Sequence, residues 1–375
     1  GNTDGNGIGD FYYAPPSGYL ALCSSNLSDT TIGPTSTTQA DDHFKTVIYD
    51  GSSGAQTITT GLQPDWIWIK VRSLTGYHNI TDTSRGITRE LFTNTTDDEE
   101  NTGRVASTSS TGFTFPSTEY GYTNENGQTF VSWNWHANGG TTSSNSDGSI
   151  TSTVQANTDA GFSIVLYAGS ESNATVGHGL GGVPDMLIWK KRNGVNDWIV
   201  YHSQNTSAPA TDHLHLNNTN ATSDPSGSTF FQDTLPTSTV FSIGTDDDVN
   251  DAKNYVVYCF RSIEGYSRFG KFSGNGNADG AFVYTGFRPA WVLIRRTDAA
   301  QDWMLFDNTR NSSNPTNLYL QPNNSTAEAS GIGDGVDLLS NGFKARNSNV
   351  TINASGSPLI YMAFAEAPFK YANAR

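Results

Sequence analysis

Two pairs of residues have the most chemically suggestive spacing in the chain. An aspartate stands three residues before an arginine at Asp82 and Arg85, and again at Asp307 and Arg310. A carboxylate and a guanidinium at this spacing can bracket a turn through charge-assisted hydrogen bonds. A glycosidase would need a second carboxylate about 5–10 Å from the first, and the sequence marks none. We therefore expect structural ion pairs and assign no catalytic residue.

His213 and His215 lie two residues apart, so in a strand both imidazoles would point to one face. Two histidines can begin a metal site, but no third ligand is identifiable around them. Residues 2–7 and 275–280 are rich in Asn, Asp and Gly and resemble the first half of a calcium-binding loop. Neither is followed by the glutamate that closes such a loop, and Asx turns explain both more simply. We expect no cofactor, with calcium as the remaining alternative.

The eight tryptophans are the side chains best suited to stacking on sugar rings. All of them lie on segments that recur along the chain, at positions 66, 68, 133, 135, 189, 198, 291 and 303. Aromatic side chains also supply a large buried area, and their recurrence at equivalent positions favours that role. We therefore expect core packing rather than sugar platforms.

One sequence pattern of ten residues, called the phrase below, occurs three times, at residues 61–70, 181–190 and 286–295. Each copy has a glycine three residues before a proline, four apolar residues shortly after the proline, and then a cation. A segment that is apolar on both faces is typical of a strand in the middle of a covered sheet. A proline suits the first residue of such a strand. The phrase therefore predicts one strand of a module that the chain uses three times.

Six or more short strands, separated by turns rich in Gly, Asn, Ser and Asp, accompany each copy of the phrase. This pattern predicts an all-β fold of three tandem antiparallel β-sandwich modules, jelly-roll-like, stacked in a row. We expect an N-terminal strand extension over residues 1–42 and modules over residues 43–141, 142–263 and 264–375. The polar boundary near residue 141 predicts a flexible linker, whereas the short boundary near residue 263 predicts rigid packing of the last two modules.

Charge and cysteine content restrict the classes of partner. The 375 residues include 36 acidic and 21 basic side chains, for a formal net charge of −15. An acidic surface repels phosphates, so neither nucleic acid nor an anionic membrane is an expected partner. No apolar run approaches the ~20 residues of a membrane span. Cys23 and Cys259 are too few for a disulfide scaffold, and they either pair or lie buried.

Residues 11–23 alternate apolar side chains in a strand, turn, strand pattern but belong to no module. Left in water, such a strand would expose both backbone groups and aromatic rings. We expect it to pair with a sheet edge of a neighbouring copy, which would propagate into a filament. The predicted self-assembly residues are Phe11, Tyr12, Tyr13, Tyr19, Leu20 and Leu22.

Asn-x-Ser/Thr sequons are frequent and suggest glycosylation of exposed turns. The candidates are Asn79, Asn173, Asn217, Asn323 and Asn349. A chain this rich in Asn, Ser and Thr also produces sequons by chance, and that alternative stays open.

Four segments, residues 9–19, 158–165, 262–267 and 365–375, carry a resemblance to a known family. The chain resembles a three-repeat β-module family of aquatic bacteriophages, whose members are virion structural or tail-fibre-like proteins. In many relatives a SPRY-like domain precedes the segment that corresponds to residues 11–13. The resemblance implies a virion or extracellular location and supplies no catalytic residues.

These observations favour a non-enzymatic structural subunit of an extracellular or phage fibre, a homo-oligomer or homopolymer joined head to tail. The alternative is a carbohydrate-binding, receptor-recognition module of a phage tail fibre that binds a cell-surface glycan. A glycosidase is the third hypothesis, for which no carboxylate pair can be chosen.

Overall fold

A computed structural model describes residues 1–21, 31–33, 38–118, 121–225, 227, 229–330, 333 and 335–366. Strands hold 38% of the residues and helices 3%, which confirms the predicted all-β fold. Three main antiparallel sheets follow one another along the chain, each with a smaller sheet of its own. We call these units module 1 (residues 44–135), module 2 (143–260) and module 3 (267–365).

The three main sheets share four strands in the same order. In each sheet one early strand, which is β1, β12 or β19, lies beside the last strand of the module, and the recurring strand and its successor follow. In module 1 this order is β1 (Phe44–Asp50), β9 (Thr129–Trp135), β3 (Trp66–Val71) and β4 (His78–Asp82). In module 2 it is β12 (Phe162–Ala168), β18 (Asn254–Phe260), β14 (Met186–Lys191) and β15 (Ile199–His202). In module 3 it is β19 (Ser267–Ser273), β25 (Pro358–Ala365), β21 (Pro289–Arg296) and β22 (Met304–Asp307).

Further strands extend two of the main sheets. Module 1 adds β5 (Arg89–Phe92) and β6 (Glu100–Asn101), and module 2 adds β10 (Ser143–Asn145), β11 (Ser152–Asn157) and β16 (Leu214–His215). The helices of the described residues are single turns: η2 (Ala40–Asp42), α1 (Asp247–Asn250) and α2 (Val350–Asn353).

A smaller sheet covers one face of each main sheet and makes the module a sandwich. Its strands are β2 (Gln56–Thr59), β8 (Gly112–Phe115) and β7 (Ser107–Ser109) in module 1, and β13 (Ala174–Gly177) and β17 (Val240–Ile243) in module 2. In module 3 they are β20 (Phe282–Tyr284), β24 (Gly342–Ala345) and β23 (Val336–Leu339).

The recurring strand lies in the middle of each main sheet, as the sequence predicts. Every residue of β3 is buried, and the same holds for β14. In β3, Ile67 and Ile69 pack under the smaller sheet, whereas Trp66 and Trp68 point to the other side. Both faces of the strand therefore need cover, one from its own module and one from outside it.

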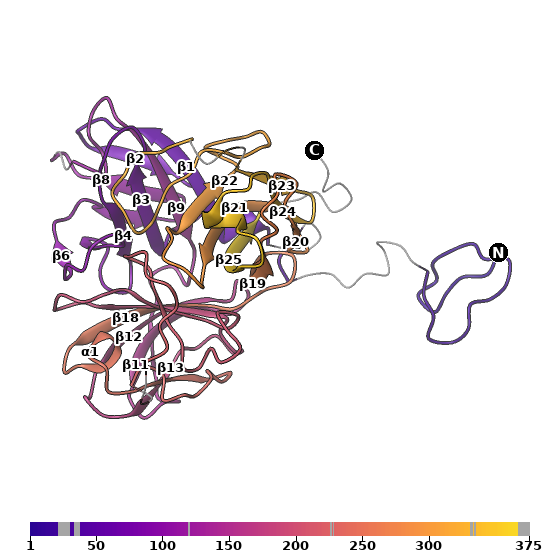
Figure 1. Cartoon of the computed structure of the whole chain (residues 1–375), viewed down its shortest axis with the longest axis horizontal. Helices are drawn as coiled ribbons and strands as arrows, with labels where there is room; N and C mark the ends of the chain where they lie inside the picture. The colour runs from indigo at the N-terminus through magenta and orange to yellow at the C-terminus, as the bar shows by residue number, and fades with distance from the viewer. Residues whose placement is uncertain are drawn as a thin grey trace.

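The three modules close into a ring, and in this ring each main sheet packs the face that its smaller sheet leaves open against the other modules. One backbone hydrogen bond recurs at all three module boundaries. The pairs, with the N–H donor first, are Glu99–Arg192, Glu328–Arg72 and Thr222–Thr297, each 2.8 Å between N and O. Modules 1 and 3 thus touch directly, and Figure 1 shows them side by side above module 2. The predicted row of modules is wrong, because a row would leave the inner faces of the end modules in water. The flexibility of the boundary near residue 141 stays a prediction.

Aromatic side chains from all three modules fill the centre of the ring. Trp66 stacks near Trp135 of its own module, with ring centroids 4.3 Å apart, and near Tyr258 of module 2, at 4.6 Å. Phe44 stacks on Phe364 of module 3 at 5.1 Å. All eight tryptophans are at most 1% exposed, which confirms their predicted core role.

The N-terminal segment, residues 1–21, is a small closed loop that stands apart from the three modules (Figure 1). Asn2 and Phe11 exchange two backbone hydrogen bonds of 2.8 Å and form one antiparallel bridge. The segment contains no strand, so the strand, turn, strand prediction is wrong for residues 11–21. A bridge between two residues is satisfied locally, and the two consecutive prolines Pro15 and Pro16 offer no N–H to continue a ladder.

Candidate assembly site

The N-terminal segment is organised around one buried carboxylate. Oδ1 of Asp4 accepts the backbone N–H groups of Asn6 and Ile8 at 2.9 Å, and Oδ2 accepts that of Ala21 at 2.8 Å. These bonds hold the Asx-rich loop through its own backbone N–H groups. They also bring Ala21, which follows the second aromatic stretch, back to the start of the chain.

The aromatic side chains of this segment are uncovered. Tyr12 is 87% exposed, Tyr13 79%, Tyr19 70% and Leu20 48%. Tyr12 and Tyr13 touch each other edge to face, with ring centroids 4.7 Å apart. Burying such side chains stabilises an interface by about 1.5–3 kcal/mol each. Of the other predicted self-assembly residues, Phe11 is half-buried and Leu22 lies outside the described residues.

Modules 1 and 3 each present an open edge of the main sheet. In module 2, β11 pairs along the outer side of β12, and β10 pairs with β11. Among the described residues no strand pairs with the outer side of β1 or of β19. An edge of this kind is a template for a further strand.

The register identifies the backbone groups that face outward. In an antiparallel sheet the backbone groups of successive residues point alternately to the two neighbouring strands. The odd-numbered residues of β12 bond to β18, so the N–H and C=O groups that point to β11 belong to Phe162, Ile164 and Leu166. The equivalent outward residues are Phe44, Thr46 and Ile48 in β1, and Ser267, Phe269 and Lys271 in β19. Of these, only Ser267 and Phe269 at the start of β19 have further partners, in the turn before the strand.

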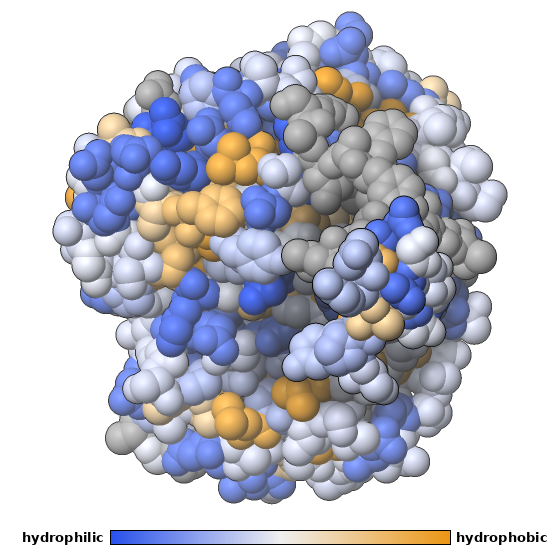
Figure 2. All heavy atoms as spheres, turned by 90° about the vertical axis from the view of Figure 1, so that its right-hand side faces the viewer, coloured by the Kyte–Doolittle hydropathy of each residue, from blue (hydrophilic) through white to orange (hydrophobic). Residues whose placement is uncertain are grey.

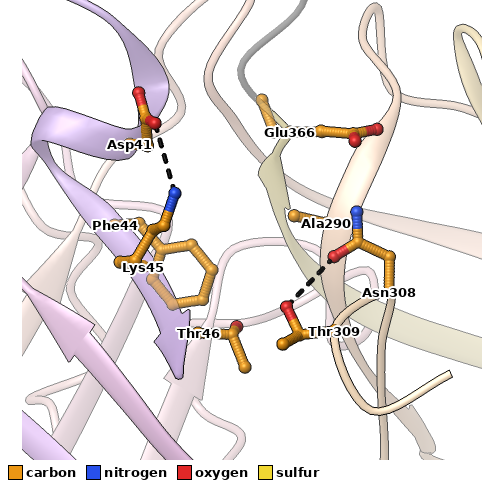
Figure 3. Close-up of a pocket in the computed structure, with 9 residues that line it drawn as sticks. Asp41, Phe44, Lys45, Thr46, Ala290, Asn308, Thr309 and Glu366 are labelled. Carbon is orange, nitrogen blue, oxygen red and sulfur yellow. Dashed lines mark hydrogen bonds and ion pairs between the residues drawn. The ribbon is translucent and has the colours of Figure 1, made fainter. Parts of the chain in front are cut away.

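A cavity of about 360 Å³ lies next to the β1 edge, between modules 1 and 3. Figure 3 shows Lys45 and Thr46 on one wall and Asn308 and Thr309 on the other. At the equivalent place between modules 2 and 1, Gln155 of β11 fills the space. Its Oε1 accepts hydrogen bonds from the hydroxyls of Thr83, at 3.0 Å, and Ser84, at 2.6 Å. The cavity in module 1 therefore marks the place of a strand that module 2 has and module 1 lacks.

A second cavity, of about 340 Å³, lies next to the β19 edge. Glu264 and Arg268 line it on the main-sheet side, and Tyr284 lines it on the small-sheet side. Arg268 lies over the ring of Tyr284, with 5.7 Å from the guanidinium carbon to the ring centroid. In module 2 the corresponding opening is closed, because Ile150, just before β11, bridges to Val176 of β13.

The two Asp-x-x-Arg motifs are buried ion pairs that bracket turns, as predicted. Arg85 donates its backbone N–H to Asp82 Oδ1 at 2.7 Å and its Nε to Oδ2 at 2.5 Å. Arg310 makes the same two bonds to Asp307, at 2.8 and 2.5 Å. All four side chains are fully buried. They lie inside the module boundaries, where their role is structural.

Each buried arginine also binds a glutamate of its module. Arg85 reaches Glu99 at 3.0 Å, and Arg310 reaches Glu328 at 2.9 Å. Burial alone would lower the pKa of Arg85, but the nearby Asp82, Tyr258 and Glu99 raise it above the usual range. The guanidinium therefore stays charged and fixes a carboxylate on each side.

His213 and His215 lie together but do not form a metal site with other residues. Their rings meet edge to face, with centroids 5.0 Å apart. Burial lowers the pKa of His213 to about 3, and the neighbouring His215 contributes to the shift. Across the described ranges, no three His, Cys, Asp or Glu side chains are grouped so that they could hold a metal ion.

The loop at residues 275–280 forms Asx turns. Asn275 Oδ1 accepts the N–H of Asn277 at 3.0 Å, and Asn277 Oδ1 accepts that of Asp279 at 2.9 Å. The Asp279 carboxylate binds the ammonium of Lys344 at 2.6 Å. This loop thus uses its polar side chains internally, as the simpler of the two predictions requires.

The five predicted glycosylation sites differ in exposure. Asn79 and Asn323 are buried, at 4% and 8% exposure. Asn217 and Asn349 are half-buried and serve as hydrogen-bond acceptors for the backbone N–H groups of Trp198 and Thr351. Asn173 alone of the five is exposed.

Two remaining predictions concern the cysteines and membranes. Cys259 lies fully buried in β18 and is bonded to no cysteine of the described residues, and burial raises the pKa of its thiol well above the usual range. Cys23 lies outside the described residues, so the pairing of the two stays untested. No helix in the described part of the chain is long and apolar enough to span a membrane.

The open edges and their cavities were missed by the sequence analysis. A signal was present, because residues 143–157 precede β12, the equivalent of β1 and β19, and contain two further short strands. Before β19 the chain offers only the turn at residues 262–266. A comparison of the segments between modules would therefore have shown that module 2 carries extra strands.

Residues 39–368 match the model of a family described as "Domain of unknown function (DUF7483)". This match covers the three modules and excludes the N-terminal segment. Comparison with curated proteins gave no match. Comparison with solved structures gave none either.

Proposed function

We propose that this chain, which belongs to the DUF7483 family, is a non-enzymatic structural subunit of an extracellular or phage fibre. Copies join head to tail when the N-terminal segment of one copy pairs with an open sheet edge of the next. One observation carries the proposal. The segment exposes Tyr12, Tyr13, Tyr19 and Leu20 outside the modules, in a chain that has open edges of its main sheets.

Addition of a strand to an exposed edge is a common mode of protein association, in which the backbone supplies affinity and alternate side chains supply specificity. The donor and the acceptor are different surfaces of the same chain, so the contact is heterologous. A heterologous contact that does not close on itself repeats without limit and gives a filament. The resemblance of residues 9–19 and 262–267 to phage fibre proteins supports the same proposal.

Electron microscopy of the purified chain tests this function. The full chain is expected to form filaments, and a variant lacking residues 1–21 is expected to remain monomeric. No residue of that segment belongs to a core cluster of the described residues, so the deletion should leave the melting temperature of the modules unchanged. Filaments of the deletion variant, or monomers of the full chain at high concentration, would refute strand donation.

A second function, carbohydrate binding, is favoured by the cavity next to β19. Tyr284 is 56% exposed there and lies beside the polar side chains of Glu264 and Arg268. An exposed ring beside a cation and a carboxylate can stack on a sugar and bind its hydroxyls. Binding on a glycan array that is lost in Tyr284→Ala would support this function for a fibre tip.

A further inference from the structure

We propose that the acceptor edge is β19 of module 3, and that residues 9–14 of a neighbouring copy add to it as a strand. This inference rests on the proposed function for the identity of the occupant. It adds which of the two open edges is used and which residues recognise the incoming strand.

Module 2 supplies the template for this arrangement. There β11, a strand of six residues, lies on β12, which is the equivalent of β19. Val154 of β11 is 3% exposed and packs into the sandwich, whereas Gln155 points to the neighbouring module. A strand on the equivalent edge is therefore part of a complete module, and module 3 lacks one of its own among the described residues.

The opening between β19 and β20 suits aromatic side chains. Tyr284 lines this opening and is 56% exposed, and Phe282, two residues before it on β20, is 47% exposed. The other modules have no aromatic residue at these two positions. Figure 2, which looks onto the face that carries the N-terminal segment, shows apolar patches among the polar side chains. Cross-strand aromatic pairs contribute about 0.5–1.5 kcal/mol beyond the area they bury. Tyr12 and Tyr13 of the incoming segment are the exposed rings that could pair here.

Charge distinguishes β19 from β1. Arg268 and Lys271 are exposed on β19 and make no ion pair with a described residue, whereas residues 1–21 contain two aspartates and no lysine or arginine. The cavity beside β1 is lined by Asp41, Lys45 and Glu366, and there the ammonium of Lys45 is already paired with Asp41 at 3.2 Å. Between two chains of net charge −15, a local cationic edge offsets part of the mutual repulsion. The acidic segment therefore fits β19 better than β1.

The backbone of β19 is free where the strand would bind. The backbone N–H of Ala365 donates to the carbonyl of Tyr266, and the N–H of Gly274 donates to the carbonyl of Ser357. These two bonds flank β19, and the register between them shows that the even-numbered residues of β19 bond to β25. The N–H and C=O of Lys271 consequently point outward and have no described partner. A proline at position 271 would remove this outward donor without breaking a bond inside the module.

Binding of a labelled peptide tests the acceptor directly. The probe is a fluorescent peptide of residues 9–21, titrated into the chain that lacks residues 1–21 and followed by anisotropy. Lys271→Pro is expected to weaken binding at least about tenfold, because it removes a ladder hydrogen bond and stiffens the edge. Ile48→Pro, which changes the equivalent outward residue of β1, is the matched control and should bind as tightly as the parent.

A charge exchange provides a second, independent readout. Arg268→Glu should weaken binding of the parent peptide, and a peptide with Asp10→Lys should recover it. Melting temperatures of all variants verify that the modules stay folded. Recovery by the exchanged pair cannot arise from misfolding.

The outcomes separate this inference from the proposed function. Loss of binding in Ile48→Pro with retention in Lys271→Pro would assign the acceptor to β1 and overturn the inference, as would a peptide that binds neither edge. Filaments that persist in Lys271→Pro but vanish on deletion of residues 1–21 would overturn the acceptor and leave the function standing. Peptide binding to β19 without filaments of the full chain would support the acceptor and refute the function.

Discussion

Tyr258 of module 2 donates its hydroxyl proton to the buried Asp82 carboxylate of module 1 across 2.8 Å. Trp133 of module 1 makes the equivalent bond to Asp307 of module 3, with 3.1 Å between Nε1 and Oδ2. The ring of modules therefore repeats one polar contact at two of its boundaries. In each, the donor lies on the last strand of one module (β18 or β9), and the acceptor is the aspartate that ends β4 or β22 of the next module.

The third boundary reverses the polarity of this contact. The closing strand of module 3 has Met362 at the donor position, and a methionine cannot donate. Module 2 has His202 in place of the aspartate, and its Nε2 donates to the carbonyl of Tyr361 at 3.2 Å. An unpaired carboxylate at this place would be buried at high cost, and the neutral imidazole avoids that cost.

Removing the Tyr258 hydroxyl should weaken the ring. Tyr258→Phe is expected to lower the free energy of unfolding by about 2 kcal/mol, the loss typical of a buried hydrogen bond to a charged group. Tyr201→Phe is the matched control, since Tyr201 is also buried but its hydroxyl makes no hydrogen bond with a described residue. Chemical denaturation measures both variants, and equal losses would show that the Asp82 contact contributes nothing specific.

Arg310, Asp307 and Glu328 form a largely buried group of three charged side chains in module 3. Removing the arginine alone should lower the free energy of unfolding more than replacing all three residues by neutral ones. Arg310→Asn leaves the Asp307 carboxylate buried without its cation, whereas Glu328 keeps its ion pair with Arg72, and the expected loss is about 3–5 kcal/mol. Module 2 has the neutral set His202, Asn205 and Thr222 at the equivalent positions. Combining Arg310→Asn with Asp307→His and Glu328→Thr should therefore recover part of the loss. A triple variant less stable than the single one in the same denaturation experiment would contradict this explanation.

Stability should fall on acidification from pH 6.5 towards pH 4. Burial lowers the pKa of His202 to about 4, so between these values the unfolded chain binds a proton that the folded chain does not. Stability is then fully present above pH 6.5 and is lost as pH falls, by at most about 1.4 kcal/mol per pH unit for one histidine. His202→Gln, which keeps a donor for Tyr361, should reduce this slope. Denaturation curves at several pH values measure it, and an unchanged slope would assign the titration to other groups.

Glycan occupancy, where it occurs, should follow exposure. In a glycosylating host, Asn173→Gln is expected to reduce the glycan mass on the chain by one glycan, whereas Asn323→Gln should leave the glycan mass unchanged. Asn323 instead accepts the N–H of Trp303 at 2.9 Å and donates to Asp302 at 2.7 Å. Its replacement should cost about 1–2 kcal/mol in unfolding free energy. A glycan detected on Asn323 by mass spectrometry would contradict the packing.

The sequence predicted the sandwich modules because periodicity and turn residues are local signals. The recurring phrase placed β3, β14 and β21 in the middle of their sheets without further information. It could not predict the ring, because the contact of Arg72 with Glu328 joins residues far apart in the chain. The cation that ends each phrase, such as Lys190, also has a role that only the ring reveals, since its ammonium donates to the carbonyl of Thr96 in the next module at 2.9 Å.

The candidate site was predicted in part. Exposed aromatic residues without a module of their own, such as Tyr12 and Tyr13, could be recognised from the sequence because no repeat accounted for them. The acceptor edges could not be recognised from their own residues, because an edge strand such as β19 is defined by a missing neighbour. A missing neighbour leaves no mark on the residues of the edge itself.

Mixing two assembly-deficient variants tests head-to-tail donation most directly. Chains lacking residues 1–21 retain an acceptor but no donor, and full chains with Lys271→Pro retain a donor but a blocked acceptor. We predict that each variant alone is monomeric in light scattering and that their mixture forms one-to-one dimers that grow no further. A mixture that stays monomeric, while the unaltered chain forms filaments, would contradict the account.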